Sequence, residues 1–566
     1  MSNCARSYYS LENGTMKVEN ELFSFSVQGV SDAAAGISDG EGLSAPLLEV
    51  RAVVKGEQRI YCVWENLPVV WMPVYREDTL MELVGEHWTV RTVKLEAFTD
   101  LNDTLTRESF AGVFRSNVPM TQTGEIFYLE NYETGDARVI ICEMADYHTA
   151  TLLIENGVVK VENAGNGLAL GFCKIGECEA LGREYYRHAC LRRELVAMSN
   201  TWGDCHGASR VCQDFVLKEM DAARDIGIDI VQIDDGWQCG RTTDRTNRDE
   251  EGFRKFYEGF WKLDEERFPN GMKCVTEYAG EKGLRAGLWF APDYHDNYAL
   301  LERDKKVLRK AYEEWGFRFF KLDMFRIRNA KEQEKFLELL REIYSWGNDV
   351  AVQIDVTRHE RLNYLCGRQY GTIFVENRYT CKGNAFPHRV LRNLWMIGRY
   401  VPTSKFQFEL VNPDLYCECY REDDPFAPVL YDMDYLFAVV MLSNPLFWME
   451  LQFVSEKRRA QLKNIIEVWK KHRGELTQAD VQPIGDRPSG RSFTGFYISK
   501  DRKPQYLLLF REVTEGSLGV FKAPVQNCRF TVLATNTEIK INPEADGVSV
   551  EFGKLRSYVF MKCEER

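Results

Sequence analysis

The spacing of hydrophobic and polar positions divides the chain into three regions, and the first extends to about residue 190. It consists of short alternating or apolar runs separated by turn residues. Examples are residues 23–27, 47–54, 90–98 and 137–142. Two more runs flank Asn156-Gly157, the dipeptide that favours a two-residue type I′ hairpin. This pattern predicts an antiparallel β-sandwich over residues 1–190.

The middle region repeats the order strand, loop and helix. Strands are predicted at residues 195–199, 228–233, 285–290, 317–322, 350–354, 372–375, 406–410 and 446–448. Helices with apolar residues on one face are predicted over about 209–226, 300–315 and 330–346. Strands that alternate with helices form parallel βαβ units, so we predict a (β/α)8 TIM barrel over residues 191–480.

Short β runs return after about residue 485 and predict a small C-terminal β-sandwich over residues 481–566. The expected fold is therefore multidomain. A central (β/α)8 barrel is flanked by an N-terminal antiparallel β-sandwich and a small C-terminal β-sandwich. A chain of 566 residues is long enough for several such domains.

Composition narrows the expected partners. With 45% hydrophobic and 28% charged residues the chain is typical of folded proteins, and its net charge of -13 argues against nucleic acid and anionic membranes. The N-terminus lacks a secretory signal pattern and no apolar run is long enough to span a bilayer, so we expect a cytoplasmic protein. Sixteen scattered cysteines indicate reduced thiols rather than a disulfide framework. The oligomeric state stays open, and a homo-oligomer is compatible with the sequence.

We expect no metal and no organic cofactor. Cys417-Glu418-Cys419 and Cys205-His206 contain metal-ligand residue types, but neither has zinc-site spacing. A glycine-rich phosphate loop is also missing from the sequence. These observations favour a neutral small substrate.

The most informative segment is Phe319-Phe320-Lys321-Leu322-Asp323, a short apolar run that ends in a carboxylate. Side chains alternate along a strand, so Lys321 and Asp323 are expected on the same face. There the ammonium would lower the pKa of Asp323 and keep it anionic, as a carboxylate nucleophile requires. The alternative is an ordinary salt bridge at the end of a strand.

Carboxylates and tryptophans gather at the ends of the predicted barrel strands, where barrel enzymes place their chemistry. The segments are 200–204 (NTWGD), 234–237 (DDGW), 289–293 (WFAPD), 321–323 (KLD), Asp355 and 376–378 (ENR). Tryptophan faces stack on sugar rings, and carboxylates accept hydrogen bonds from sugar hydroxyls. The pattern therefore favours a carbohydrate pocket. The alternatives are helix capping for Asp234 and Asp235 and core packing for Trp237, which we favour for that tryptophan.

In this order and spacing, the motifs at 200–202, 234–237, 287–293 and 321–323 resemble glycoside hydrolase family 36 and its clan of α-galactosidases and related α-glycosidases. The resemblance covers about residues 195–500 and includes the segment 483–496. It implies that Asp323 is the nucleophile and that Lys321 contacts sugar hydroxyls. It further implies that Asp234 and Asp235 bind the 4- and 6-hydroxyls and that Trp202 and Trp289 line the pocket.

The chain departs from the family pattern at the acid/base. The family has an aspartate at the end of the sixth strand, where this sequence has Glu376, so Glu376 is the leading acid/base and Asp355 its main rival, ahead of Asp293 and Asp204. A retaining mechanism needs this carboxyl about 5 to 5.5 Å from the nucleophile. The family's cysteine- and glycine-rich motif after the fifth strand is also missing, which leaves the C2 substituent of the sugar open.

Arg358 and Arg378 follow the fifth and sixth predicted strands. Either side chain can clamp a substrate carboxylate or hold a catalytic one, and surface or structural pairing is the alternative.

The resulting hypothesis is a retaining exo-α-glycosidase, α-galactosidase-like, acting on α-linked oligosaccharides or glycosides. The alternatives are a relative specific for an α-N-acetylgalactosaminide or a β-L-arabinopyranoside, a transglycosylase, and a catalytically silent carbohydrate-binding protein.

Overall fold

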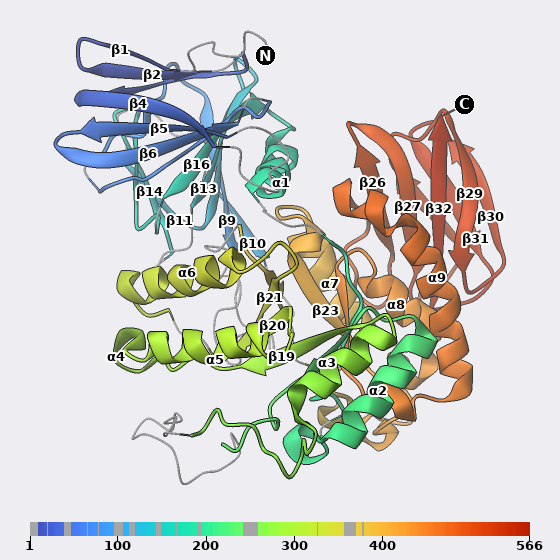
Figure 1. The fold of residues 1–566 in the computed structure, drawn as a ribbon. Helices are drawn as coiled ribbons and strands as arrows, with labels where there is room; N and C mark the ends of the chain where they lie inside the picture. Colours follow the sequence, from blue (N-terminus) through green and yellow to red (C-terminus); the bar gives the residue numbers. More distant parts are fainter. Residues whose placement is uncertain are drawn as a thin grey trace, which may run out of the picture.

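Two β-rich regions lie on either side of a central barrel with its surrounding helices, the N-terminal one at the upper left and the C-terminal one at the upper right in Figure 1. The computed structural model describes residues 9–19, 21–38, 47–64, 66–76, 78–95, 106–111, 119–142, 149–165, 167–189, 194–204, 206–240, 259–324, 327–355, 369–375 and 378–565. Within these ranges no helix is both long and apolar enough to cross a bilayer.

A closed barrel of eight parallel strands forms the centre, which confirms the expected barrel. Its strands, in order around the barrel, are β17 (Met198–Asn200), β18 (Ile230–Ile233), β19 (Arg285–Phe290), β20 (Phe319–Asp323), β21 (Ala351–Asp355), β22 (Thr372–Phe374), β23 (Phe406–Leu410) and β24 (Asn444–Phe447). β24 pairs with β17 and closes the ring. These strands are almost entirely buried because the barrel interior covers one face and helices cover the other.

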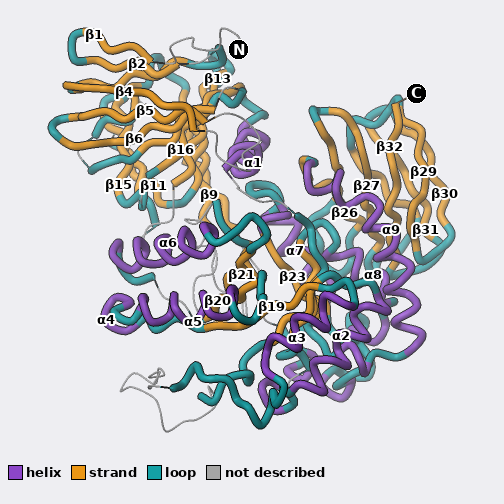
Figure 2. Tube along the Cα trace, in the orientation of Figure 1, coloured by secondary structure: helices purple, strands orange, loops and turns teal. Residues whose placement is uncertain are grey.

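Helices follow the barrel strands and pack outside them (Figure 2). Their bounds are α2 (Gln213–Ile226), α3 (Gly271–Glu281), α4 (His295–Tyr298), α5 (Leu301–Glu313), α6 (Ala330–Ser345), α7 (Pro387–Ile397), α8 (Met433–Val440) and α9 (Glu456–Gln478). Local sequence sets several ends. Asn329 caps α6 by accepting a hydrogen bond from the Glu332 backbone N–H, and Gly227, with φ of 95°, terminates α2 in the left-handed conformation.

The N-terminal region is antiparallel, as expected. Its nine-stranded sheet has the order β10-β9-β12-β13-β16-β7-β6-β5-β4, and smaller sheets have the orders β11-β14-β15-β8 and β1-β2-β3. The strands are β1 (Tyr9–Glu12), β2 (Thr15–Glu19), β3 (Ser24–Gln28), β4 (Val30–Ser38), β5 (Leu47–Val54), β6 (Glu57–Trp64), β7 (Val69–Met72), β8 (Met81–Glu82), β9 (Trp88–Leu95), β10 (Thr106–Ala111), β11 (Met120–Thr123), β12 (Ile126–Asn131), β13 (Asp136–Cys142), β14 (Thr151–Glu155), β15 (Val158–Glu162) and β16 (Leu168–Lys174). Asn156 and Gly157 have φ of 52° and 77° between β14 and β15, as a type I′ turn requires.

The C-terminal region consists of two antiparallel sheets packed on a shared apolar core. Their strand orders are β25-β26-β27-β32-β29 and β28-β31-β30. The strands are β25 (Asp480–Gly485), β26 (Phe493–Lys500), β27 (Lys503–Arg511), β28 (Leu518–Lys522), β29 (Cys528–Thr535), β30 (Ile539–Glu544), β31 (Gly547–Phe552) and β32 (Ser557–Glu565). This agrees with the expected small C-terminal β-sandwich.

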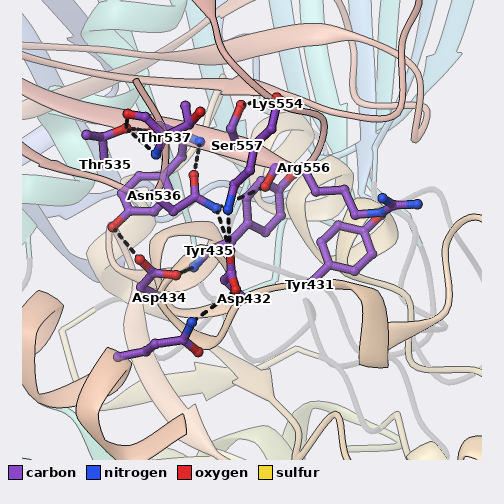
Figure 3. Close-up of polar contacts among 12 residues, drawn as sticks. Tyr431, Asp432, Asp434, Tyr435, Thr535, Asn536, Thr537, Lys554, Arg556 and Ser557 are labelled. Carbon is purple, nitrogen blue, oxygen red and sulfur yellow. Dashed lines mark hydrogen bonds and ion pairs between the residues drawn. The ribbon is translucent and has the colours of Figure 1, made fainter. Parts of the chain in front are cut away.

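A polar joint connects α8 of the barrel to the C-terminal sheets (Figure 3). Asp432 precedes α8, and its Oδ2 accepts hydrogen bonds from Lys554 Nζ at 2.6 Å and Asn536 Nδ2 at 3.2 Å. Tyr558 donates to Asp434 across the same joint. Burial, then the neighbouring Asp432, raises the pKa of Asp434 to about 6. The joint therefore combines one ion pair with one carboxylate that is costly to ionise.

A second joint ties α1 (Cys178–Ala189), the helix before the barrel, to the first C-terminal strand. Asp480 receives a two-point contact from Arg183, with Nε at 2.7 Å and Nη2 at 3.0 Å, and a third hydrogen bond from Arg187 Nη1 at 2.7 Å. Burial alone would raise the pKa of Asp480, but the two guanidinium groups hold it well below its ordinary value. The carboxylate therefore stabilises the folded protein above its unfolded pKa, and this stabilisation is lost as the pH falls.

Replacing Asp480 by asparagine should lower stability strongly, because two buried arginines lose their counter-charge. Breaking a buried ion pair in this way costs about 3 to 5 kcal/mol. Urea unfolding at pH 7 should show a lower midpoint for Asp480→Asn, and the difference from the wild type should shrink in acid. The matched control is Asp423→Asn in the exposed Arg421 pair, where we expect a change below about 0.5 kcal/mol. Equal midpoints for the two variants would contradict the prediction.

Candidate active site

The C-terminal ends of four neighbouring barrel strands bring the predicted site residues to one rim. Parallel pairing sets Trp289 beside Lys321 and Asp323 beside Asp355. Asp234 directly follows β18, which pairs with β19. Residues from 234 to 355 in the sequence thus meet because each lies at the same end of a parallel strand.

At the centre of this rim, the Lys321 ammonium lies between two carboxylates. Its Nζ is 2.7 Å from Asp234 Oδ2 and 3.0 Å from Asp355 Oδ2, and all three side chains are buried. Asn200 Nδ2 also donates to Asp234 Oδ2, at 2.7 Å. Burial alone would lower the pKa of Lys321, but the aspartates, first Asp234 and then Asp355 and Asp323, raise it above its ordinary value. Lys321 is therefore a fixed cation.

Among the described residues, two N–H groups donate to Asp323. Trp289 Nε1 donates to its Oδ2 at 3.0 Å, and the Met324 backbone N–H donates to its Oδ1 at 2.5 Å. Met324 has φ of 60°, a left-handed conformation that is uncommon for a residue with a side chain. Each carboxylate oxygen of Asp323 thus accepts one of these two hydrogen bonds with one of its lone pairs.

The sequence predicted that Lys321 keeps the pKa of Asp323 low, and the structure corrects this prediction. Burial, then the charge of Asp355, raises the pKa of Asp323 to about 6, although Lys321 and the Trp289 hydrogen bond act in the opposite direction. The lysine forms ion pairs with Asp234 and Asp355, at 2.7 and 3.0 Å. Asp323 is thus ionised at neutral pH, but at a cost to the folded state.

Asp234 and Asp235 hold a turn at the rim rather than the start of a helix. The Asp235 backbone N–H donates to Asp234 Oδ1 at 2.9 Å, and Gln238 Nε2 donates to Asp235 Oδ1 at 2.6 Å. No helix begins among the described residues that follow, up to residue 240. Neither aspartate therefore caps a helix among these residues, and the alternative of helix capping is wrong there.

The three tryptophans of the motifs divide between the rim and the core. Trp289 lies at the rim against Asp323, and Trp202, which is partly exposed, donates from Nε1 to the Tyr379 hydroxyl at 3.2 Å. Trp237 is fully buried and stacks on Trp261 at 5.9 Å between ring centroids. The core packing that we favoured for Trp237 is confirmed.

Sequence reasoning missed two aromatic residues of this rim. Tyr379 partners Trp202, and Trp448 has the Lys321 ammonium over its ring at 5.2 Å from the centroid. Neither residue was part of the motifs that we singled out. The one sequence signal belongs to Trp448, which directly follows a barrel strand. Together with Trp202 they form an aromatic wall, in which the Tyr379 and Trp448 rings lie 5.9 Å apart.

Glu376 and Arg358 lie outside the described residues. Two rivals of Glu376 for the acid/base role have partners of their own. Asp293 Oδ1 is 2.6 Å from His295 Nδ1, and Asp204 Oδ2 accepts the Glu450 backbone N–H at 2.8 Å. Burial, then the neighbouring carboxylates, raises the pKa of Asp204 to about 7. The third rival, Asp355, is bound to Lys321.

Arg378 is buried, and its guanidinium donates to the Asn384 carbonyl at 3.3 Å while its backbone N–H donates to Glu409. These contacts favour structural pairing over a substrate clamp.

The cysteine prediction needs one correction. Cys417 and Cys419 are free, exposed thiols, but Cys381 is disulfide-bonded, so the chain is not fully reduced in this structure. Among the described residues no group of three or more histidines, cysteines, aspartates or glutamates is arranged to hold a metal ion.

The structure places a closed barrel, with carboxylates and tryptophans at its C-terminal rim, between two antiparallel β regions. A family model described as Melibiase matches residues 190–312. The α-galactosidase Mel36A of Lactobacillus acidophilus is 34% identical over 81 residues, which cover 14% of this chain and only 10% of that protein. The segment that the family model matches contains the barrel strands β17, β18 and β19.

Solved structures extend the likeness to the whole fold. The family 36 α-galactosidase AgaA of Geobacillus stearothermophilus superposes with a TM-score of 0.66 over 94% of this chain and 87% of that chain, at 12% identity. The α-galactosidase of Lactobacillus brevis gives a TM-score of 0.64 over 95% and 86%, also at 12% identity. Variants of AgaA have been solved with stachyose and raffinose. The sequence likeness is thus confined to parts of the chain, and the solved structures show a shared fold.

The raised pKa of Asp323 predicts that this carboxylate destabilises the folded protein as it ionises. An aspartate has a pKa of about 3.9 when unfolded, so the cost develops between about pH 4 and 6 and then stays, at no more than about 3 kcal/mol. The melting temperature of Asp323→Asn minus that of the wild type should therefore rise from pH 4.5 to pH 7.5. A difference that is flat or falls over this interval would contradict the pKa.

Proposed function

We propose that this protein is a retaining exo-α-glycosidase that removes a terminal α-linked, galactose-type sugar. The observation that carries the proposal is the placement of Asp323 at the barrel rim. Its carboxylate is held by Trp289 and Met324 beside the Lys321 centre, where two further carboxylates and aromatic rings surround it. An ionised, oriented carboxylate is suited to attack a sugar carbon.

In the first step, an oxygen of Asp323 attacks C1 of the sugar while the bond from C1 to the leaving oxygen breaks. Glu376 gives its proton to that leaving oxygen, and a glycosyl ester forms on Asp323. In the second step, Glu376 takes a proton from water, the water oxygen bonds to C1, and the ester bond breaks. Asp323 is released as a carboxylate, and the sugar leaves with its original anomeric configuration.

The remaining rim residues bind the sugar in this proposal. In Asp234 and Asp235, some lone pairs of the carboxylate accept hydrogen bonds from protein groups. The other lone pairs accept hydrogen bonds from sugar hydroxyls. Trp289 and Trp202 supply apolar surface for the ring. Asp355 is bound to Lys321 and adjacent to Asp323 in the sheet, which suits it to orient the lysine better than to shuttle protons.

Galactose-type specificity is favoured because the relatives and solved neighbours are α-galactosidases. An α-N-acetylgalactosaminidase, a β-L-arabinopyranosidase and a transglycosylase use the same chemistry on a different sugar or acceptor. A catalytically silent carbohydrate-binding protein is the alternative of another class. A screen with nitrophenyl α-glycosides and a nitrophenyl β-L-arabinopyranoside separates the enzymes from the binding protein, because only the enzymes release nitrophenol, and the preferred sugar identifies the specificity.

Asp323→Asn should abolish turnover on the best substrate of that screen, because an amide cannot form the glycosyl ester. We expect a fall of at least about a thousandfold in kcat/KM, with the fold retained. The control is Asp293→Asn, which changes a neighbouring rim aspartate that this proposal leaves out of the reaction. Residual activity of more than a few per cent in Asp323→Asn would show that Asp323 is not the nucleophile.

Glu376→Gln should slow substrates with poor leaving groups strongly and those with good leaving groups much less, because only the former need a proton. Added azide should restore turnover, since it attacks the glycosyl ester without a general base. The released product should then be the glycosyl azide of retained configuration. Asp355→Asn is the matched variant, and rescue of it rather than of Glu376→Gln would transfer the acid/base role to Asp355.

A further inference from the structure

Trp448 is fixed at the end of the last barrel strand, beside the first. Its backbone N–H donates to the Leu410 carbonyl at 2.9 Å. Gly203, in the loop after β17, packs so tightly here that an added Cβ would lie 2.3 Å from the Met449 nitrogen and 2.5 Å from the Trp448 carbonyl carbon. The backbone that carries this indole is therefore held from both sides.

The indole ring itself borders the charged centre of the site. Lys321 Nζ lies 5.2 Å from the ring centroid, a cation–π distance, and the ring is 2% exposed. Phe374 and Tyr379 pack around it at 5.4 and 5.9 Å between centroids. The ring thus lies at the barrel rim on the side of the last strand, beside the ammonium that binds Asp234 and Asp355.

The N–H group of this indole distinguishes Trp448 from the three tryptophans of the sequence motifs. Trp202 donates to Tyr379, Trp237 to the Trp289 carbonyl and Trp289 to Asp323. Trp448 Nε1 is buried and has no hydrogen-bond partner among the described residues. A buried donor without an acceptor costs free energy, so such groups are rare unless a ligand or water completes them.

We propose that Trp448 Nε1 donates a hydrogen bond to a hydroxyl oxygen of the bound sugar. This inference rests on the proposed function and makes Trp448 a specificity-determining residue of the same site. Lys321 and Trp448 can only donate, whereas the aspartates at the rim can only accept when ionised. A sugar hydroxyl both donates and accepts, so it is the ligand group that pairs with both sets at once.

The test is a cycle that combines Trp448→Phe with single deoxygenations of the preferred nitrophenyl α-glycoside. Phenylalanine keeps an aromatic face under Lys321 and removes the N–H. We expect kcat/KM on the parent glycoside to fall about tenfold, the typical effect of one hydrogen bond to a substrate group. On the one deoxy glycoside that lacks the acceptor oxygen, variant and wild type should agree within twofold. Trp202→Phe, whose lost N–H already had a protein partner, should show no coupling to that same hydroxyl.

The outcomes separate this inference from the proposed function. If Trp448→Phe matches the wild type on the parent glycoside, or loses the same factor on every deoxy glycoside, the hydrogen bond is wrong while the glycosidase stands. If the wild type hydrolyses none of the glycosides, the proposed function fails. The same cycle is then measured as binding of the free sugar and its deoxy forms by calorimetry, where lack of coupling at every position would overturn the inference.

Discussion

The ion triplet of Asp234, Lys321 and Asp355 is the interaction on which the rest of the site depends. One buried ammonium contacts two carboxylates at 2.7 and 3.0 Å and thereby connects the ends of β18, β20 and β21. Buried charges are expensive to remove from water, and they are tolerated only when each has a partner. The closed barrel supplies this pairing because it brings all strand ends to one small rim.

Asp323 is the third carboxylate whose charge acts on the same lysine. Three aspartates surround one lysine, and Asp323 receives its direct contacts from a tryptophan and a backbone N–H. Its pKa rises to about 6, so the folded protein carries a cost at neutral pH for keeping this group ionised. Groups whose ionisation is unfavourable for folding are typical of catalytic positions, where reactivity is retained at the expense of stability.

Much of the fold was predictable because local pattern and global structure agree. The parallel strands are apolar and short, the helices between them are amphipathic, and Asn156-Gly157 has the conformation that its sequence favours. The position of the candidate site was predictable, because Trp289, Lys321 and Asp323 lie among the last three residues of a strand and Asp234 directly follows one. Trp448 and Tyr379 were missed because their importance comes from neighbours that are distant in the sequence.

The sequence by itself determined the order of elements and the residue types at the strand ends, because periodicity and turn chemistry are properties of neighbouring residues. Only the tertiary structure decided which charges pair. From the sequence, Lys321 was expected to lower the pKa of Asp323, two positions away on the same strand. In the barrel its ammonium reaches across to Asp234 and Asp355, and burial outweighs its effect on Asp323. Distances between strands and the loss of water set that balance, and both arise only when the barrel closes.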